Sequence, residues 1–277
     1  MTARVETLLS TPTVVVRDAI RAIGGPAEPQ TAAPVPTLVF PYRGVFVRHV
    51  GGELVVAEPN QVLFFNANEE HRIAYPLAEG AAFLLLEIEP ALLGEIAPAK
   101  IVREIQPIAF APSRLRIDPR AQALVAMLRY SLREEIAEPL EAESLALTLA
   151  QRALGPRTAH EAGASVSMQK LVDRVKLILT ADLARRWTLA EIAAEAGGSP
   201  VYLTQAFRQV EAVPLYRYQL RLRLAKALDL MGEYEDLSAL SHELGFSSHS
   251  HFSAAFKQAY GRSPTEFRQS VILREDR

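Results

Sequence analysis

The chain has 277 residues, of which 49% are hydrophobic, with a formal net charge of −2 and no cysteine. This length favours two domains with packed cores, and the absence of cysteine excludes disulfides, thiolate metal sites and thiol redox sensing. The apolar runs are too short to cross a bilayer, and the N-terminus lacks the features of a signal peptide. We therefore expect a cytoplasmic protein without a membrane partner.

The N-terminal part of the sequence is typical of a β domain. Short strand-like runs lie at residues 45–50, 62–65 and 83–89, separated by glycine, proline and asparagine. Strands of this length and spacing, continuing to about residue 110, favour a small antiparallel barrel or sandwich.

From Pro119 the apolar period becomes helical. Residues 119–136 place Leu124, Met127, Leu128 and Leu132 on one side, and residues 140–154 carry leucines in the same way. These sequences predict helices over about 119–154 that complete a first domain of residues 1–155. Because amphipathic helices can bury their apolar faces between protomers, we also expect a homodimer seam here. The small and polar residues 156–167 predict a linker.

The remaining residues, 168–277, predict a helical domain. Thr188 and Glu191 have the spacing of a capping box. The glycine pair that begins at Gly197 suits a helix end, and Ser199 followed by proline suits the start of the next helix. A helix, a tight glycine turn and a second helix make a helix-turn-helix unit at about 188–209.

This unit is present twice. Leu203 and Phe207 recur as Phe252 and Phe256 about 49 residues later, and Asp236 and Gly245 begin and end the matching helix. The second unit spans about 236–258. Two copies are too few for a solenoid. A pair of such units suits a protein that contacts, at two places, a partner with a repeating structure.

A helix-turn-helix unit reads DNA by placing its second helix in the major groove. The candidate recognition helices are residues 200–209 and 248–258, joined by a helix over 215–231. At 17 residues this connecting helix would be about 26 Å long. This length could place the two recognition helices in successive major grooves, which lie about 34 Å apart. The side chains expected to face DNA are Ser199, Val201, Thr204, Gln205 and Arg208 in the first unit and Ser248, His249, Ser250, Ser253 and Ala254 in the second.

Other interpretations of these polar residues are open. The exposed positions of both helices could simply be solvated. Phosphate contact is open to four arginines: Arg208, Arg217, Arg221 and Arg223. On the connecting helix, however, arginines alternate with leucines, so some of them must pack or pair within the domain. The histidines near the second unit lack the further ligands of a zinc site, so we expect no metal there.

The segments SPVYLTQAFRQ (199–209) and GFSSHSHFSAAFKQAYGRSPTEFR (245–268) closely resemble the DNA-binding domain of AraC-type transcriptional regulators. The resemblance covers about residues 168–270 and implies two helix-turn-helix units, binding to double-stranded promoter DNA, and often a ligand-sensing N-terminal domain. This chain departs from the usual pattern at Gly198, Ala212, Ser241 and Ala254. The last stands where an outward arginine is common, so we expect weaker DNA contact at the second helix.

Residues 38–76 resemble the cupin-like sensor domains that precede such DNA-binding domains. The resemblance names no effector. Residues that could line an effector pocket are Tyr42, Arg43, Arg48, His49, His71 and Tyr75. Glu69, Glu70 and His71 suggest an alternative, a cupin-type metalloenzyme with a helical appendage, but the paired histidines of such enzymes are missing.

We thus expect an α+β protein of two domains, a cupin-like barrel with trailing helices and an all-α domain with two helix-turn-helix units. Its expected function is sequence-specific transcriptional regulation, controlled by a small-molecule effector or by dimerisation. We expect no catalytic residue, metal or cofactor. RNA polymerase is an expected partner if the chain is an activator.

Overall fold

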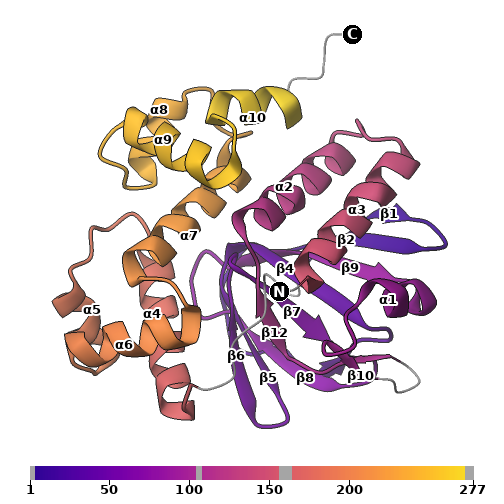
Figure 1. The fold of residues 1–277 in the computed structure, drawn as a ribbon, viewed down its shortest axis with the longest axis horizontal. Coiled ribbons are helices and arrows are strands. Elements are labelled where there is room, and N and C mark those ends of the chain that lie inside the picture. The colour runs from indigo at the N-terminus through magenta and orange to yellow at the C-terminus, as the bar shows by residue number, and fades with distance from the viewer. Residues whose placement is uncertain (1–3, 104–107, 156–163, 272–277) are drawn as a thin grey trace. The chain divides into compact units, whose positions relative to one another are not determined.

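The computed structural model describes residues 4–103, 108–155 and 164–271 (Figure 1). The chain divides into two compact units, and the main division falls between residues 159 and 160. Within the described residues, none of the helices combines the length and apolar character needed to cross a membrane. The part of the chain before this division is the N-terminal domain, and the part after it is the C-terminal domain.

The N-terminal domain contains a six-stranded antiparallel sheet. Its order is β1-β2-β9-β4-β7-β12. The strands are β1 (Arg4–Ser10), β2 (Val14–Arg21), β4 (Thr37–Gly44), β7 (Gln61–Phe65), β9 (Ala81–Ile88) and β12 (Arg114–Arg116). Segments far apart in the sequence are therefore neighbours, as where Val39 of β4 pairs with Leu63 on one side and Leu85 on the other.

A second sheet has the order β3-β8-β5-β6. It is built from β3 (Thr31–Ala32), β5 (Phe46–Val50), β6 (Glu53–Ala57) and β8 (Glu70–Ala74), and β10 (Val102–Arg103) pairs with β11 (Ala109–Phe110) separately. Side chains of both sheets form one core that includes Phe46, Phe65, Tyr75 and Phe83. The expected antiparallel β domain is confirmed, and aromatic rings fill the space between its sheets.

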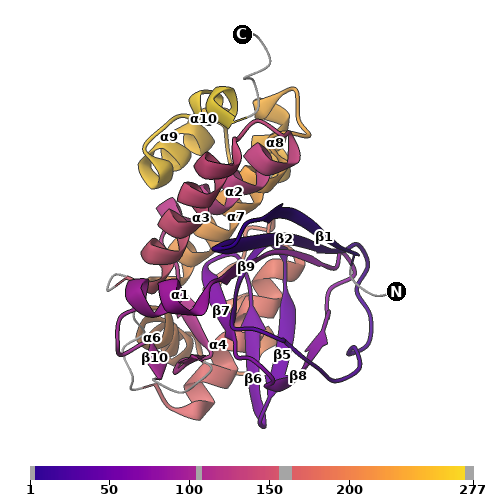
Figure 2. The same cartoon turned by 90° about the vertical axis from the view of Figure 1, so that its right-hand side faces the viewer.

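Helices cover the other face of the six-stranded sheet (Figures 1 and 2). They are α1 (Pro90–Ile96), α2 (Pro119–Arg133) and α3 (Pro139–Leu154). Leu128 and Leu149 are fully buried there, and Leu124, Leu132 and Leu145 pack against the same core. The predicted helices are confirmed, and contacts within the domain account for their apolar faces. The dimer seam stays a prediction.

The C-terminal domain is helical over its described residues. It consists of α4 (Val166–Ala181), α5 (Leu189–Ala196), α6 (Pro200–Glu211), α7 (Leu215–Leu230), α8 (Leu237–Glu243), α9 (His249–Tyr260) and α10 (Pro264–Val271). Of the predicted linker 156–167, residues 156–163 lie outside the described part of the chain. Helix α4 begins at Val166, two residues before the expected start, because the Ser165 side chain caps it by accepting from the backbone N–H of Met168.

The duplicated residues occupy equivalent places in two small cores. Leu203 and Phe207 are fully buried between α4, α5 and α6, and their counterparts Phe252 and Phe256 are fully buried in the second unit. Phe252 and Phe256 lie 5.7 Å apart between ring centroids, and Phe267 of α10 stacks edge-on against Phe256 at 5.8 Å. Each turn has a glycine in the left-handed conformation, Gly197 at φ 73° and Gly245 at φ 78°. Two helix-turn-helix units therefore form from one repeated pattern.

Candidate nucleic-acid interface

The sequence signals around α5 and α6 form the expected local contacts. Thr188 and Glu191 make a complete capping box at the start of α5. The Ser199 hydroxyl accepts from the backbone N–H of Tyr202 at 3.2 Å, and Pro200 follows it at the first helical position. These caps fix where α6 begins and hence which of its side chains face outward.

Helix α6 presents the predicted residues on its solvent side. Val201, Thr204, Gln205 and Arg208 are exposed, whereas the intervening stripe is buried. The four exposed residues line a shallow depression of about 670 Å³ together with Leu189, Pro200 and Gln209. Sequence reasoning did not single out Leu189 or Gln209. Helical spacing could have found Gln209, because it lies four residues after Gln205.

The Thr204 hydroxyl is engaged within the helix. It donates to the Pro200 carbonyl at 2.9 Å. Its oxygen lone pairs can still accept a hydrogen bond from a DNA base. Gln205 and Arg208 are therefore the residues of this face with the longest polar reach.

Helix α9 presents shorter side chains, and some of them form hydrogen bonds within the helix itself. Ser248 caps it by accepting from the backbone N–H of His251 at 3.1 Å. His249, Ser250 and Ala254 are exposed and Ser253 is half-buried, with its hydroxyl 3.2 Å from His249 Nε2. Ser248, like Ser199, uses its hydroxyl oxygen to cap a helix. Its hydroxyl proton can still be donated to a phosphate oxygen. The structure thus places the predicted residues of each unit along one helix, from its N-cap onward.

The connecting helix α7 contains arginines with different surroundings. Arg217 is exposed, and its Nε donates to the neighbouring Tyr216 hydroxyl at 3.1 Å. Arg223 instead donates to backbone carbonyls, and burial lowers the pKa of its guanidinium. The expectation that some of these arginines pair within the domain is confirmed for Arg223.

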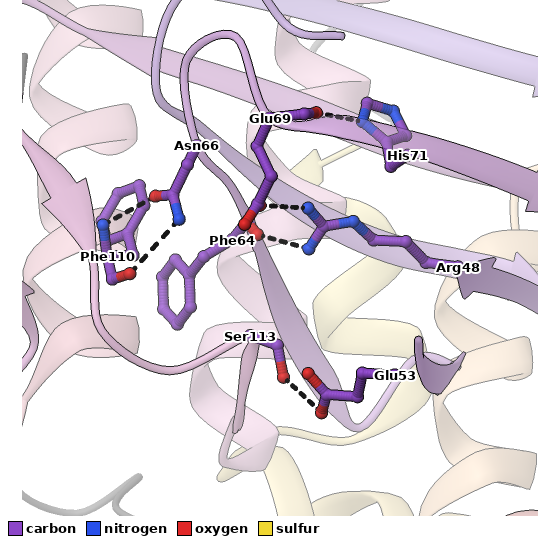
Figure 3. Close-up of polar contacts among 8 residues, drawn as sticks. All are labelled: Arg48, Glu53, Phe64, Asn66, Glu69, His71, Phe110 and Ser113. Atoms are coloured by element: carbon purple, nitrogen blue, oxygen red, sulfur yellow. Dashed lines mark hydrogen bonds and ion pairs between the residues drawn. The ribbon is translucent and has the colours of Figure 1, made fainter. Parts of the chain in front are cut away.

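The N-terminal domain has a buried arginine that composition alone does not reveal. Arg48 of β5 is 1% exposed; it donates to the Phe64 carbonyl and to Glu69 Oε2, both at 2.7 Å (Figure 3). Its guanidinium lies 4.1 Å from the centroid of the Phe65 ring. Burial lowers the pKa of Arg48, and the Glu69 carboxylate opposes that shift. The alternation of the strand could have placed Arg48 on the inner face, since Phe46 also points inward.

The residues that suggested a metal site have separate partners. Glu69 pairs with Arg48, and Glu70 accepts from Gln30. His71 Nδ1 lies 3.1 Å from the Glu69 carbonyl, and burial together with the nearby Arg48 lowers its pKa. Among the described residues, no group of three histidine, aspartate or glutamate side chains could hold a metal ion.

The other candidate effector residues are divided between the buried core and a surface depression. Tyr75 is buried in the core, where burial raises its pKa to about 12, and Tyr42 donates to buried Asp18 at 2.7 Å. His49 and His71 line a depression of about 410 Å³ with Gly51, Gly52 and residues of β8. His49 and His71 thus border a space that could hold a small molecule.

Comparison with known proteins adds sequence relationships to this geometry. A model described as a helix-turn-helix domain matches residues 192–270, and one described as an AraC-like ligand binding domain matches residues 37–150. The probable transcriptional regulator LumQ of Photobacterium leiognathi is 24% identical over 84% of this chain and 88% of its own length. The chain belongs to the AraC family of transcriptional regulators.

Two further comparisons differ in extent. The transcriptional activator RhaR of Klebsiella pneumoniae is 33% identical over 45% of this chain and 43% of its own length. The crystal structure of ToxT from Vibrio cholerae shares 11% identity, covers 98% of this chain and 100% of its own, and has a TM-score of 0.38. The relatives are regulators, and they give no support to a cupin-type metalloenzyme.

Proposed function

We propose that each protomer of this AraC-type regulator reads two adjacent major-groove sites of promoter DNA, one with α6 and one with α9. The observation that supports this proposal is the presence of two capped helix-turn-helix units on one domain, each with exposed polar side chains on its second helix. Helix α7 joins them and has 16 residues, a length of about 24 Å at 1.5 Å per residue. Adding half a helix diameter at each end approaches the groove spacing of about 34 Å.

The two units have different chemistry and should read different half-sites. In the first, Gln205 can bind adenine in a bidentate manner, Thr204 can reach several base edges, and Ser199, Val201 and Arg208 flank them. In the second, Ser248, Ser250 and Ser253 offer short hydroxyls and His249 offers an imidazole, beside the apolar Ala254. Such groups suit phosphate and water-mediated contacts. We infer that the first unit carries more of the base discrimination.

The N-terminal domain is proposed to control DNA binding. It receives a small-molecule effector or relays homodimerisation, and the depression beside His49 and His71 lies within the 300–1,000 Å³ range of small-molecule sites at about 410 Å³. An effector acts only by favouring one arrangement of the protein over another. The regulator works in the cytoplasm, without catalysis, and contacts RNA polymerase where it activates.

A gel-shift series tests the proposed DNA contacts. Sequence-specific binding by the full chain should fall when Gln205→Ala is combined with His249→Ala and Ser253→Ala, because loss of one bidentate base contact alone costs about 1–3 kcal/mol. Gln151→Ala, an exposed glutamine of α3, is the matched control and should bind as the wild type does. Undiminished binding by the triple variant would contradict the proposal.

A ligand screen tests the proposed effector. A compound that binds the folded domain at 100 times its Kd should raise the free energy of unfolding by about 2.7 kcal/mol. Thermal unfolding would then shift with concentration. If no compound class shifts it while dimerisation still governs DNA binding, the domain is a dimerisation module without a receptor role. Bound stoichiometric metal with turnover would instead support an enzyme.

A further inference from the structure

One side chain of α7 connects the two helix-turn-helix units directly. Arg223 Nε donates to the Leu183 carbonyl at 2.8 Å, and its Nη2 donates to the carbonyls of Ala184 at 3.1 Å and Arg185 at 2.9 Å. Its Nη1 donates to the Gly245 carbonyl at 3.1 Å. The first three acceptors precede α5 of the first unit, and Gly245 forms the turn of the second.

These contacts use most of the guanidinium's hydrogen-bonding capacity. Arginine has five N–H donors in a planar fork, and Arg223 directs four of them to backbone carbonyls. Burial lowers the pKa of Arg223, and Arg186 lowers it further while Asp182 opposes the shift. Arg223 therefore has little capacity left to bind a DNA phosphate.

The surrounding packing supports the same connection. Gln219, one turn before Arg223, donates to the carbonyls of Leu183 at 3.3 Å and Arg185 at 3.0 Å. At Gly245, a Cβ atom would lie 2.1 Å from the Ala184 carbonyl oxygen. The turn of the second unit thus meets the backbone of residues 183–185 with no space for a side chain.

We infer that Arg223 is a positioning residue that fixes the second helix-turn-helix unit relative to the first, and thereby sets the spacing between the two DNA half-sites that one protomer accepts. The statement about half-sites rests on the proposed function, whereas the connection between the units does not. Lysine keeps the charge but not the fork, so Arg223→Lys separates the geometric role from the electrostatic one.

A distance measurement without DNA tests the connection itself. The chain has no cysteine, so spin labels can be attached at Gln209→Cys on α6 and Gln258→Cys on α9, both exposed positions. The wild-type background should give a narrow distance distribution, and Arg223→Lys should give a clearly broader one. Arg217→Lys, the same exchange on the exposed side of α7, should leave the distribution narrow.

Gln219→Ala is a milder second variant in case Arg223→Lys does not fold, and it should broaden the distribution partially. An unchanged width in Arg223→Lys, or in Gln219→Ala where that variant replaces it, overturns the inference.

Binding assays then test the consequence for spacing. Duplexes selected with the wild-type full chain would carry both half-sites, one half-site, or both half-sites with one inserted base pair. Wild type and Arg217→Lys should bind the selected spacing roughly tenfold more tightly than the altered one, as expected for two linked sites of fixed geometry. Arg223→Lys should lose this preference while retaining its affinity for one half-site.

If wild type itself shows no preference for two half-sites, the proposed function fails. If Arg223→Lys keeps the wild-type preference, the role of Arg223 fails.

Discussion

Ala212 ends α6 in a conformation that suits glycine better. Its φ is 54°, and the equivalent residue at the end of α9 is Gly261 at φ 79°. A non-glycine residue in the left-handed region costs roughly 1–2 kcal/mol. A new glycine also increases the conformational entropy of the unfolded chain, which offsets about 0.4–1 kcal/mol of the gain in stability. Ala212→Gly should therefore raise the free energy of unfolding by about 0.5–1 kcal/mol, measured by urea unfolding.

The twin position supplies the control for this prediction. A Cβ at Gly261 would meet no atom within 4 Å, so Gly261→Ala introduces backbone strain without a clash. It should destabilise the protein by a similar amount. If both substitutions move stability in the same direction, the strain at Ala212 is not the cause.

Glu191 makes stability of the C-terminal domain depend on pH. Hydrogen bonds from the Thr188 hydroxyl and backbone N–H, and then from Arg185, lower its pKa to about 2. Because the folded pKa lies below the ordinary value of 4.5, the stabilisation is present above pH 4.5 and is lost as the pH falls toward 2. Glu191→Gln should reduce the loss of stability in this window. The fluorescence of Trp187, the one tryptophan of the chain, can follow the unfolding. An identical pH dependence in both proteins would refute this assignment.

The sequence predicted residue roles well where the partners are local. The capping residues Thr188 and Ser199 act as their spacing indicated. Arg223 could not be assigned in this way, because its acceptors lie 40 and 22 residues away in the chain. Arg48 was likewise grouped with residues that could line an effector pocket, although the pleat of β5 turns it inward to a buried position.

At the scale of elements, a buried ion pair joins α4 to the recognition helix α6. Lys176 Nζ lies 2.6 Å from Glu211 Oε1, and their side chains are 0% and 1% exposed. Lys176 also lies 5.6 Å from the centre of the Tyr218 ring. This pair fixes the C-terminal end of α6 within the core of the first unit.

Breaking one partner of this pair leaves a buried charge. Lys176→Met should destabilise the C-terminal domain by about 3–5 kcal/mol, whereas the double variant Lys176→Met with Glu211→Leu should recover most of that loss. Denaturant unfolding of the two variants measures the coupling. Equal destabilisation by the single and double variants would show that the charge of Glu211 is not the source of the cost.

Elements were predictable where a periodic pattern was strong. Helices α2, α3, α6 and α9 follow their apolar stripes closely. Strand β1 was not predicted from residues 4–10, because most of its side chains are exposed and show no alternation of burial. It is held by pairing with β2, a contact that depends on the sheet rather than on its own sequence.

At the scale of the whole molecule, the net charge of −2 conceals the basic residues near α6 and α7. DNA binding should weaken steeply with salt, because phosphate contacts release counterions. If Arg208 contacts a phosphate, Arg208→Gln should reduce the slope of log K against log salt by about 1. An unchanged slope would place Arg208 away from the phosphates.

Footprinting of the selected operator tests the central claim, that one protomer reads two half-sites with two different helices. The wild-type chain should protect two neighbouring major-groove segments on one face of the duplex. Gln205→Ala should lose protection of one segment, and His249→Ala with Ser253→Ala should weaken protection of the other. If both variants lose the same segment, or if the wild-type chain protects a single segment per protomer, the account is contradicted.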